Sequence, residues 1–498
     1  MATIQTKSIQ STAMIMIGFT IGAINMLVLS PKILTTEQLG LTRIIADAGL
    51  TLATLCTLGS LPVIYKFFPF YKSYLNKDQV DLPFVTGMIC LAGLLIMSFT
   101  GWLARDIIVR KFSEKSPLFV EYSYLVYPYC FFMLCFMWLE SFAISLHKGV
   151  LSNSLRELLP RVFFTLLLVI VGFKTISEKE FYHLFSVSYF LPVAILFLIL
   201  RKTRQFQFVP QLSSVTTRLS GKMTNFGLFV FGAQFLNLLS RTVDTFILSA
   251  KGDRGLTDTA IFTIATYIVT LLEVPQRSMN SVTIPVLAEA WKNKDLAHIQ
   301  RIYQKSVTNL LVVGLVMFGL IWLNLHNIGS FLGKNFSGIE AVILFMGVGK
   351  LIDLGTGANS QIIGTSNFWK VDFTTNVIYT IVALPMNYFL ISRYGLMGAA
   401  YSTLISLTFY NAMRFGFLWF KFGMQPYTMK DLWAVIIAVV AIFLANILPL
   451  QPNIFFDCFV RTSLFCIIIL PGLYFMKISS QINDWVEKTV WDKWVKRK

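Results

Sequence analysis

Charged residues are scarce in this chain. Of its 498 residues, 13% are Asp, Glu, Lys or Arg and 55% are hydrophobic, whereas an average soluble domain carries about 25% charged residues. So little polar surface cannot shield the apolar side chains from water. The composition therefore excludes a soluble globular protein, and the long apolar runs predict an all-α polytopic membrane protein.

Several signals of chemistry are also missing. The six cysteines form no C-x-x-C pair, and the four histidines lack the spacing of a metal site. No P-loop, dinucleotide-binding glycine motif or nucleophile triad occurs. The longest polar stretches, 201–222 and 288–305, are too short for an independent soluble domain. We therefore expect no metal site, no cofactor and no catalytic residue.

Acidic residues are outnumbered, 25 against 42 Lys and Arg, which gives a net charge of +17. The basic residues concentrate in alternate loops, including 201–222 and 288–305, and in the tail 477–498. The segment 105–115, on the predicted outer side, is also basic and does not fit this bias. An excess of basic loops marks the cytoplasmic side of a membrane protein. The charge therefore places both termini in the cytoplasm and argues against nucleic acid as a partner.

The apolar runs predict about fourteen transmembrane helices, each near the ~20 residues that cross a bilayer. We expect these spans at 10–30, 40–66, 82–102, 119–146, 151–173, 181–200, 223–250, 258–287, 306–324, 338–363, 370–391, 396–420, 431–449 and 456–476. They would form an N-terminal six-helix bundle, a C-terminal six-helix bundle, two additional helices and a cytoplasmic amphipathic tail, at 1–205, 206–425, 426–476 and 477–498 respectively.

Ionisable side chains recur inside these spans. A charge at bilayer depth costs on the order of 3 kcal/mol, so it normally faces a partner or a wet cavity. Many of these charges have the i,i+3 or i,i+4 spacing that brings helical side chains together. Such pairs are Arg43/Asp47, Arg241/Asp244, Glu273/Arg277 and Lys350/Asp353. The pattern predicts a charge-lined chamber inside a helical bundle, which a transporter of an ionic substrate requires.

Parts of the sequence resemble a known family. The relevant stretches are Pro31, Leu39-Gly40, Leu58-Gly59, the segment 66–72 (KFFPFYK), 284–291 (IPVLAEAW) and 394–400 (YGLMGAA). In these stretches the chain resembles polysaccharide transporters of the multidrug/oligosaccharidyl-lipid/polysaccharide (MOP) exporter superfamily. It departs from the family at 251–258, where a longer segment replaces a short Leu-Gly turn.

The resemblance implies two six-helix bundles in a V-shaped arrangement, with two extra C-terminal helices. It also implies a flippase of the bacterial inner membrane. Such a protein moves undecaprenyl-diphosphate-linked oligosaccharide from the cytoplasmic to the outer leaflet by alternating access, coupled to an H⁺ or Na⁺ gradient. The expected partners are this lipid-linked substrate, membrane lipids and other polysaccharide-assembly proteins.

Basic side chains outnumber acidic ones within the predicted spans, which suits an anionic headgroup because arginine offers a planar fork to phosphate oxygens. The candidate diphosphate ligands are Arg43, Arg161, Arg241, Arg277, Lys350 and Arg414. The candidates for ion coupling or charge pairing are Asp47, Glu140, Asp244, Glu273 and Asp353. Glu140 has no base one helical turn away, so we expect either a proton carrier or a bond to another helix. Arg43, Arg414 and Arg461 lie near span ends, from which long side chains can reach the membrane surface.

Alternatives stay open. The intrahelical pairs can neutralise the bases without any substrate. A drug/cation antiporter of the same superfamily would need a chamber rich in acids rather than bases. A membrane glycosyltransferase or polymerase would present large outer loops, and the predicted outer loops are short, so we do not expect an enzyme.

Overall fold

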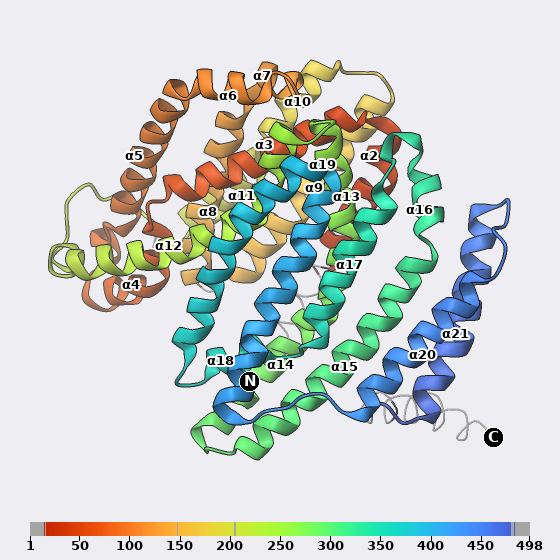
Figure 1. Cartoon of the computed structure of the whole chain (residues 1–498). Helices are drawn as coiled ribbons and strands as arrows, with labels where there is room; N and C mark the ends of the chain where they lie inside the picture. The colour runs from red at the N-terminus through yellow and green to blue at the C-terminus, as the bar shows by residue number, and fades with distance from the viewer. Residues whose placement is uncertain (1–13, 15, 147, 204–205, 480–482, 484–498) are drawn as a thin grey trace, which may run out of the picture. The chain divides into compact units, whose positions relative to one another are not determined.

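The computed structural model describes residues 14, 16–146, 148–203, 206–479 and 483, and every regular element among them is a helix (Figure 1). The elements are η1 (Ile24–Leu29), α2 (Ser30–Ile33), α3 (Thr36–Cys56), α4 (Ser60–Tyr74), η2 (Lys77–Gln79), α5 (Leu82–Leu103), α6 (Arg105–Phe112), α7 (Pro117–Tyr122), η3 (Ser123–Leu125), α8 (Val126–Ser145), α9 (Gly149–Gly172), α10 (Glu178–Ser186), α11 (Phe190–Arg201), α12 (Ser214–Lys251), α13 (Leu256–Thr270), α14 (Glu273–Lys292), α15 (Leu296–Leu323), α16 (Leu325–Leu332), η4 (Lys334–Phe336), α17 (Ile339–Gly355), α18 (Asn359–Thr365), α19 (Trp369–Phe422), α20 (Met429–Asn446) and α21 (Ile454–Phe475). The predicted all-α class is confirmed. The predicted amphipathic tail, 477–498, falls almost wholly outside the described residues.

The number of candidate membrane spans among the described residues is lower than the predicted fourteen, and it depends on how bent helices are counted. Within the described residues, nine helices are long and apolar enough to cross a membrane, or up to eleven if each bent pair is one span. Helix α19 counts once although it has 54 residues, about 80 Å at 1.5 Å per residue. Gly395 breaks it with non-helical φ 55° and ψ −132°. This break lies between two predicted spans, 370–391 and 396–420.

Other predicted spans are broken helices rather than single rods. The predicted span 40–66 is α3 followed by α4, separated by a turn in which Leu58 and Gly59 have φ values of 44° and 81°. A Cβ on Gly59 would lie 2.6 Å from the carbonyl oxygen of Gly227. The predicted span 338–363 is α17 followed by α18, bent by 47°. The predicted spans rest on hydropathy, which depends on composition. It cannot indicate where a residue adopts a positive φ and interrupts a helix.

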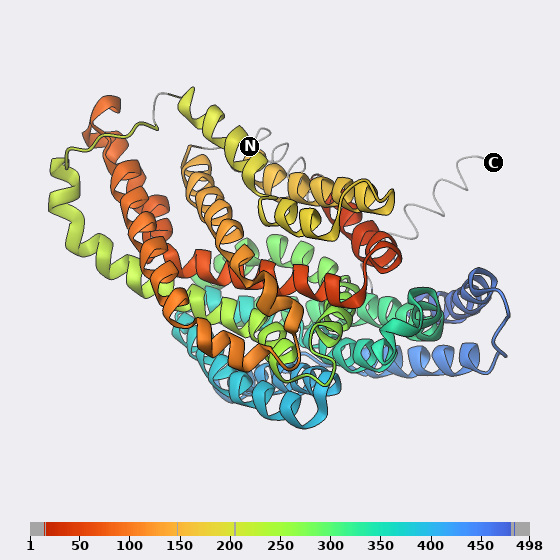
Figure 2. The same cartoon turned by 90° about the horizontal axis from the view of Figure 1, so that it is seen from above.

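The chain divides into two compact units, 1–263 and 264–498. The boundary follows α12 because this helix packs against α3 and α4 of the N-terminal unit (Figure 2). The bundle boundary predicted at 205/206 and the V-shaped arrangement remain predictions.

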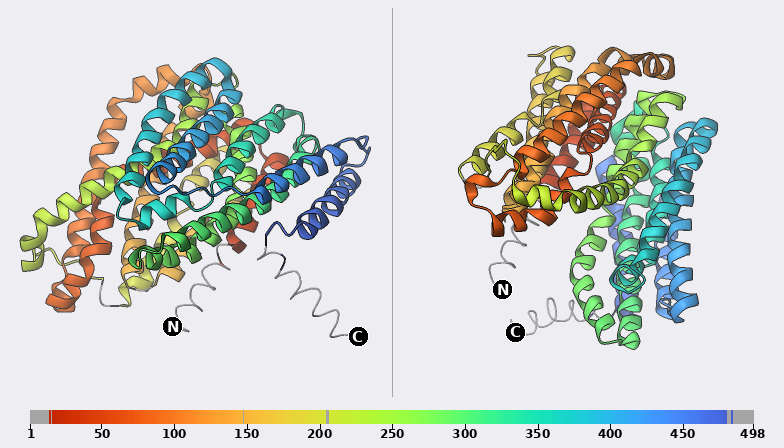
Figure 3. Two further views of the ribbon diagram at one scale, coloured as in Figure 1. Left: turned by 60° about the horizontal axis from the view of Figure 1, so that its bottom comes forward. Right: turned by 90° about the vertical axis from the view of Figure 1, so that its left-hand side faces the viewer.

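In the C-terminal unit, α20 packs against α15 and α21 (Figures 1 and 3). Four alanines of α20 are fully buried, namely Ala434, Ala438, Ala441 and Ala445. Three and four residues apart, they form one helical face. Small side chains let helix backbones approach closely in a membrane, where packing rather than the hydrophobic effect drives association.

A buried ion pair ties α21 to its neighbours. Arg461 Nε donates to Asp457 Oδ2 at 2.8 Å, and Arg461 Nη2 donates to the Leu448 carbonyl oxygen at 2.7 Å. Asn327 Nδ2 and the backbone nitrogen of Gln451 also donate to the Asp457 carboxylate, at 2.7 and 2.9 Å. Only 4% of the Arg461 side chain is exposed, so the expectation that it reaches the membrane surface is wrong. Its hydrogen-bond acceptors lie inside the protein.

We expect the substitution Arg461→Met to destabilise the chain, because it leaves the Asp457 carboxylate buried without its base. Breaking one partner of a buried pair costs about 3–5 kcal/mol. The double variant Asp457→Asn, Arg461→Met should unfold at a higher temperature than the single variant, measured by tryptophan fluorescence in detergent. Equal midpoints for the two variants would contradict a charge-based role.

Candidate functional site

The C-terminal unit holds a polar cluster that joins α14 to α17. Lys350 Nζ lies 2.7 Å from Asp353 Oδ2 and 3.0 Å from Glu273 Oε1. Arg277 Nη2 donates to Glu273 Oε2 at 2.9 Å. The sequence predicted two separate intrahelical pairs, and the structure joins them because Lys350 bridges both carboxylates. Only 12% of the Lys350 side chain is exposed, so its charge is balanced by these acids rather than by water.

Asn411 of α19 extends this cluster. Its Nδ2 donates to Asp353 Oδ1 at 2.9 Å. Its Oδ1 accepts hydrogen bonds from Thr356 Oγ1 at 2.8 Å and from Asn359 Nδ2 at 3.0 Å. Sequence reasoning missed Asn411. The available signal was an amide inside the apolar predicted span 396–420, where a polar side chain needs a partner from another helix.

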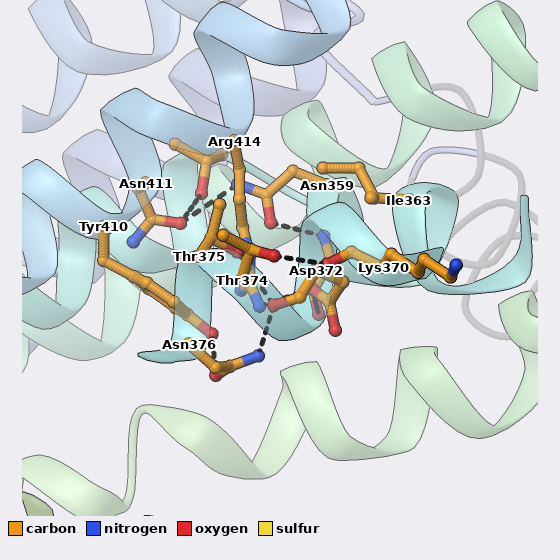
Figure 4. Close-up of polar contacts among 12 residues, drawn as sticks. Asn359, Ile363, Lys370, Asp372, Thr374, Thr375, Asn376, Tyr410, Asn411 and Arg414 are labelled. Carbon is orange, nitrogen blue, oxygen red and sulfur yellow. Dashed lines mark hydrogen bonds and ion pairs between the residues drawn. The ribbon is translucent and has the colours of Figure 1, made fainter. Parts of the chain in front are cut away.

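The network continues to an ion pair between Asp372 and Arg414 (Figure 4). Ser360 Oγ donates to Asp372 Oδ1 at 3.1 Å, and Arg414 Nη2 donates to the same oxygen at 2.5 Å. The Arg414 guanidinium carbon lies 3.8 Å from the ring centroid of Tyr410, within the range of a cation–π contact. Tyr410 Oη in turn donates to Asn376 Oδ1 at 2.7 Å.

The position of Arg414 corrects one expectation. It is 4% exposed, so its guanidinium is enclosed against Asp372 and the Tyr410 ring rather than extended to the membrane surface. Its Nε is buried and has no hydrogen-bond partner among the described residues. Asp372 was not among the predicted site residues.

The bend between α17 and α18 positions the middle of this network. Gly357 has a φ of 62°, which L-residues with a Cβ rarely adopt. The adjacent Ala358 backbone nitrogen donates to Ser306 Oγ at 3.1 Å. The backbone hydrogen bonds of α17 end at this bend, and Asn359 and Ser360 begin α18. Their side chains hydrogen-bond to Asn411 and Asp372 respectively.

The N-terminal unit contains a second group of candidates on α3 and α12. Arg43 Nε lies 2.8 Å from Asp47 Oδ2, and Thr245 Oγ1 donates to the same oxygen at 2.7 Å. Asp244 is buried, and its Oδ1 has no hydrogen-bond partner among the described atoms. The side chain of Arg241 lies outside the described residues, so its pairing with Asp244 and its role as a ligand remain predictions.

A third group joins α8 to α9. Glu140 is 1% exposed and forms an ion pair with Arg156, sixteen residues further along the chain. Of the two expectations for Glu140, the structure therefore shows the bond to another helix. Arg161 Nη2 lies 2.7 Å from Glu157 Oε2, and the Arg161 carbonyl oxygen accepts from Asn25 Nδ2 at 2.9 Å.

Comparisons with known proteins add evidence at the level of the fold. No family model matches the chain, and no curated protein matches its sequence. The inward-facing conformation of a multidrug resistance MATE family transporter of the MOP superfamily matches with a TM-score of 0.59 at 16% identity, over 84% of this chain and 98% of that one. A MOP superfamily transporter from Pyrococcus furiosus matches with a TM-score of 0.52 at 14% identity, over 83% and 96%.

The fold is that of MATE transporters. A further MATE structure, a complex with MaL6, has a TM-score of 0.51 at 15% identity over 84% of this chain and 96% of that one. At these identities the likeness concerns the fold. None of these likenesses concerns the polysaccharide branch.

Within this MATE fold, basic charges of the predicted spans are compensated. Seven bases of these spans form an ion pair with an acid, namely Arg43, Arg156, Arg161, Arg277, Lys350, Arg414 and Arg461. The pairs differ in which partner is accessible. The arginine is the more exposed partner in Arg156–Glu140, at 45% against 2%, and in Arg277–Glu273, at 64% against 31%. Lys350 and Arg414 are instead more enclosed than their acids.

We expect Lys350→Met to lower the unfolding temperature, because Glu273 and Asp353 would lose the base that they share. Adding Asp353→Asn should recover part of the loss, with a coupling energy of about 0.5–3 kcal/mol for residues in direct contact. The matched control is Lys334→Met, which removes an exposed lysine and should leave the midpoint unchanged. Thermal unfolding of the purified variants measures each value, and strictly additive effects would contradict the shared-base arrangement.

Proposed function

We propose that this chain is an alternating-access transporter that moves an undecaprenyl-diphosphate-linked oligosaccharide from the cytoplasmic to the outer leaflet of the bacterial inner membrane. The observation that carries this proposal is the set of ion pairs in which the arginine is more exposed than its acidic partner. An ionised side chain at membrane depth normally faces a water-filled space or a partner. These pairs therefore offer guanidinium groups, rather than carboxylates, to a substrate.

The paired arginines suit a substrate that binds and leaves. A diphosphate group accepts two parallel hydrogen bonds from a guanidinium fork. In the empty state the neighbouring carboxylate balances the arginine, and in the loaded state phosphate oxygens do so as well. The charge is then never left buried without a partner, which would cost several kcal/mol. The accessible candidates are Arg43, Arg156 and Arg161 in the N-terminal unit and Arg277 in the C-terminal unit.

The enclosed charges suit a different task in the same cycle. Lys350 and Arg414 are held by carboxylates rather than offered to solvent, and the Asn411 amide donates to one of these carboxylates, that of Asp353. We assign Glu273 and Asp353 to coupling with H⁺ or Na⁺, because a change in their charge would alter every bond around Lys350. Asp47, Glu140 and Asp244 are the corresponding candidates in the N-terminal unit.

A drug/cation antiporter is the second candidate, and a specific observation favours it. Asp47 and Asp244 are buried carboxylates on neighbouring helices, and Asp244 keeps one oxygen without a partner among the described atoms. Buried carboxylates are what a cationic substrate needs. The MATE-fold relative matched at 0.59 is a multidrug resistance transporter. The Pyrococcus furiosus relative, however, is described as having a binding pocket of reverse polarity, which supports use of this fold for more than one sign of charge.

We expect the purified chain in liposomes to move a fluorescent undecaprenyl-diphosphate oligosaccharide between leaflets, and Arg277→Ala to slow this movement roughly tenfold at limiting substrate. A hydrogen bond to a charged group contributes about 1.5–3 kcal/mol, and 1.4 kcal/mol corresponds to about tenfold. The matched control is Arg110→Ala on α6, an exposed arginine outside the candidate spans. Accessibility of the label to a quencher added outside the liposomes gives the rate.

The same liposomes separate the two candidates. Export of a cationic dye by the unaltered chain, with no movement of the lipid-linked oligosaccharide, would replace the flippase by the antiporter. Movement of the oligosaccharide with equal rates in Arg277→Ala and Arg110→Ala would keep the flippase and remove Arg277 from its binding site.

A further inference from the structure

A cavity of about 460 Å³ lies where α11 ends and the following segment returns to the bundle. It is lined by Phe197, Arg201, Phe206, Gln207 and Phe208. None of these residues belongs to the charge pairs described above. The cavity thus combines three aromatic rings with one permanently charged guanidinium, and the proposed transport cycle uses none of them.

The aromatic wall is held in place by the bundle. Phe206 is 4% exposed, and its ring centroid lies 5.2 Å from that of Trp138 and 5.2 Å from that of Phe142. The Phe208 centroid lies 5.8 Å from that of Trp138. These contacts enclose the Phe206 ring and place Phe208, 55% exposed, beside Trp138, so a ligand would lose little free energy in ordering Phe206.

A polar contact fixes the same segment from the other side. Gln207 Nε2 donates to Asp78 Oδ1 at 3.1 Å. A second contact nearby along the chain has the Ser213 backbone nitrogen donating to Asp81 Oδ2 at 2.9 Å. The residues 206–208 that line the cavity are therefore held to the turn that precedes α5.

The cavity lies at the polar end of a membrane-facing surface. The candidate span Glu178–Arg201 ends at the arginine that lines the cavity. Along the same span Phe190 and Leu198 are 56% and 58% exposed, as expected for side chains that contact acyl chains. Arg201 and Lys202 are both exposed at its end. The basic bias of the loops places this end at the cytoplasmic leaflet, where anionic lipids concentrate.

We propose that this cavity binds one anionic phospholipid, with the phosphate at Arg201 and an acyl chain against Phe197 and Phe208. The apolar surface around Leu198 leads an acyl chain to the aromatic wall, and the guanidinium fork at the rim matches a phosphate. Arg201 and Lys202 together favour a headgroup with net negative charge over a zwitterionic one. This lipid is distinct from the transported substrate, and its site does not depend on the proposed function.

Native mass spectrometry of the full chain, with phosphatidylglycerol and phosphatidylcholine of matched acyl chains, tests the proposal. The unaltered chain should retain one phosphatidylglycerol in preference to phosphatidylcholine. Arg201→Gln should reduce that occupancy roughly tenfold, and Phe208→Ala should also weaken it because the acyl contact is lost. Both side chains are exposed, so unchanged unfolding temperatures would show that the variants are folded.

Lys111→Gln provides the matched control. Lys111 is an exposed base of α6, and α6 follows the end of α5 opposite to the turn that contacts the cavity segment. The 22 residues of α5 span about 33 Å, so this variant should retain the lipid fully. Equal occupancy in Arg201→Gln and the unaltered chain would overturn the proposal, as would equal retention of the two lipids. Displacement of the lipid by millimolar inorganic phosphate alone would overturn the role of the acyl chain.

Discussion

The structure depends on one electrostatic constraint, the free energy required to hold an ionised side chain at membrane depth. Ion pairs meet this constraint in both units. They form within one helix for Arg43–Asp47, between α8 and α9 for Arg156–Glu140, and across the Gly395 break of α19 for Arg414–Asp372. A pair that joins two helical segments restricts how they can move, because separating the charges without water or a substitute partner is unfavourable. Burying these charges is therefore unfavourable for folding. A substrate that replaces one partner of a pair can release the restraint on the helices.

Helix breaks determine where these charges meet. In a straight helix through 338–363, Lys350, Asp353 and Asn359 would all follow one helix axis. The bend after α17 instead lets residues at the start of α18 hydrogen-bond to Asn411 and Asp372 of α19. Membrane helices tolerate such breaks when side chains satisfy the freed backbone groups, and Ser306 does so at Ala358. Network and bend thus support each other.

Local pairs were predictable because helical geometry places them together. Glu273–Arg277 and Lys350–Asp353 formed as their spacing of four and three residues indicated. The bridge from Lys350 to Glu273 was not predictable in the same way, since it joins α14 to α17. Asn411 and Asp372 were missed for that reason as well. Their bonding partners are distant in sequence, and a single chain without related sequences carries no signal of which helices are neighbours.

The sequence by itself determined that this chain is helical, that it is built for a membrane and that charges lie inside it, because composition and hydrophobic run length decide the solvent in which a chain can fold. It also determined the pairs within single helices. Only the tertiary structure decided which charges are accessible and which are enclosed. Burial depends on neighbouring helices and on breaks such as those at Gly59 and Gly357, whose φ values the hydropathy of the chain does not reveal. The aromatic cavity beside Arg201 arose in the same way, from a segment folded back onto Trp138.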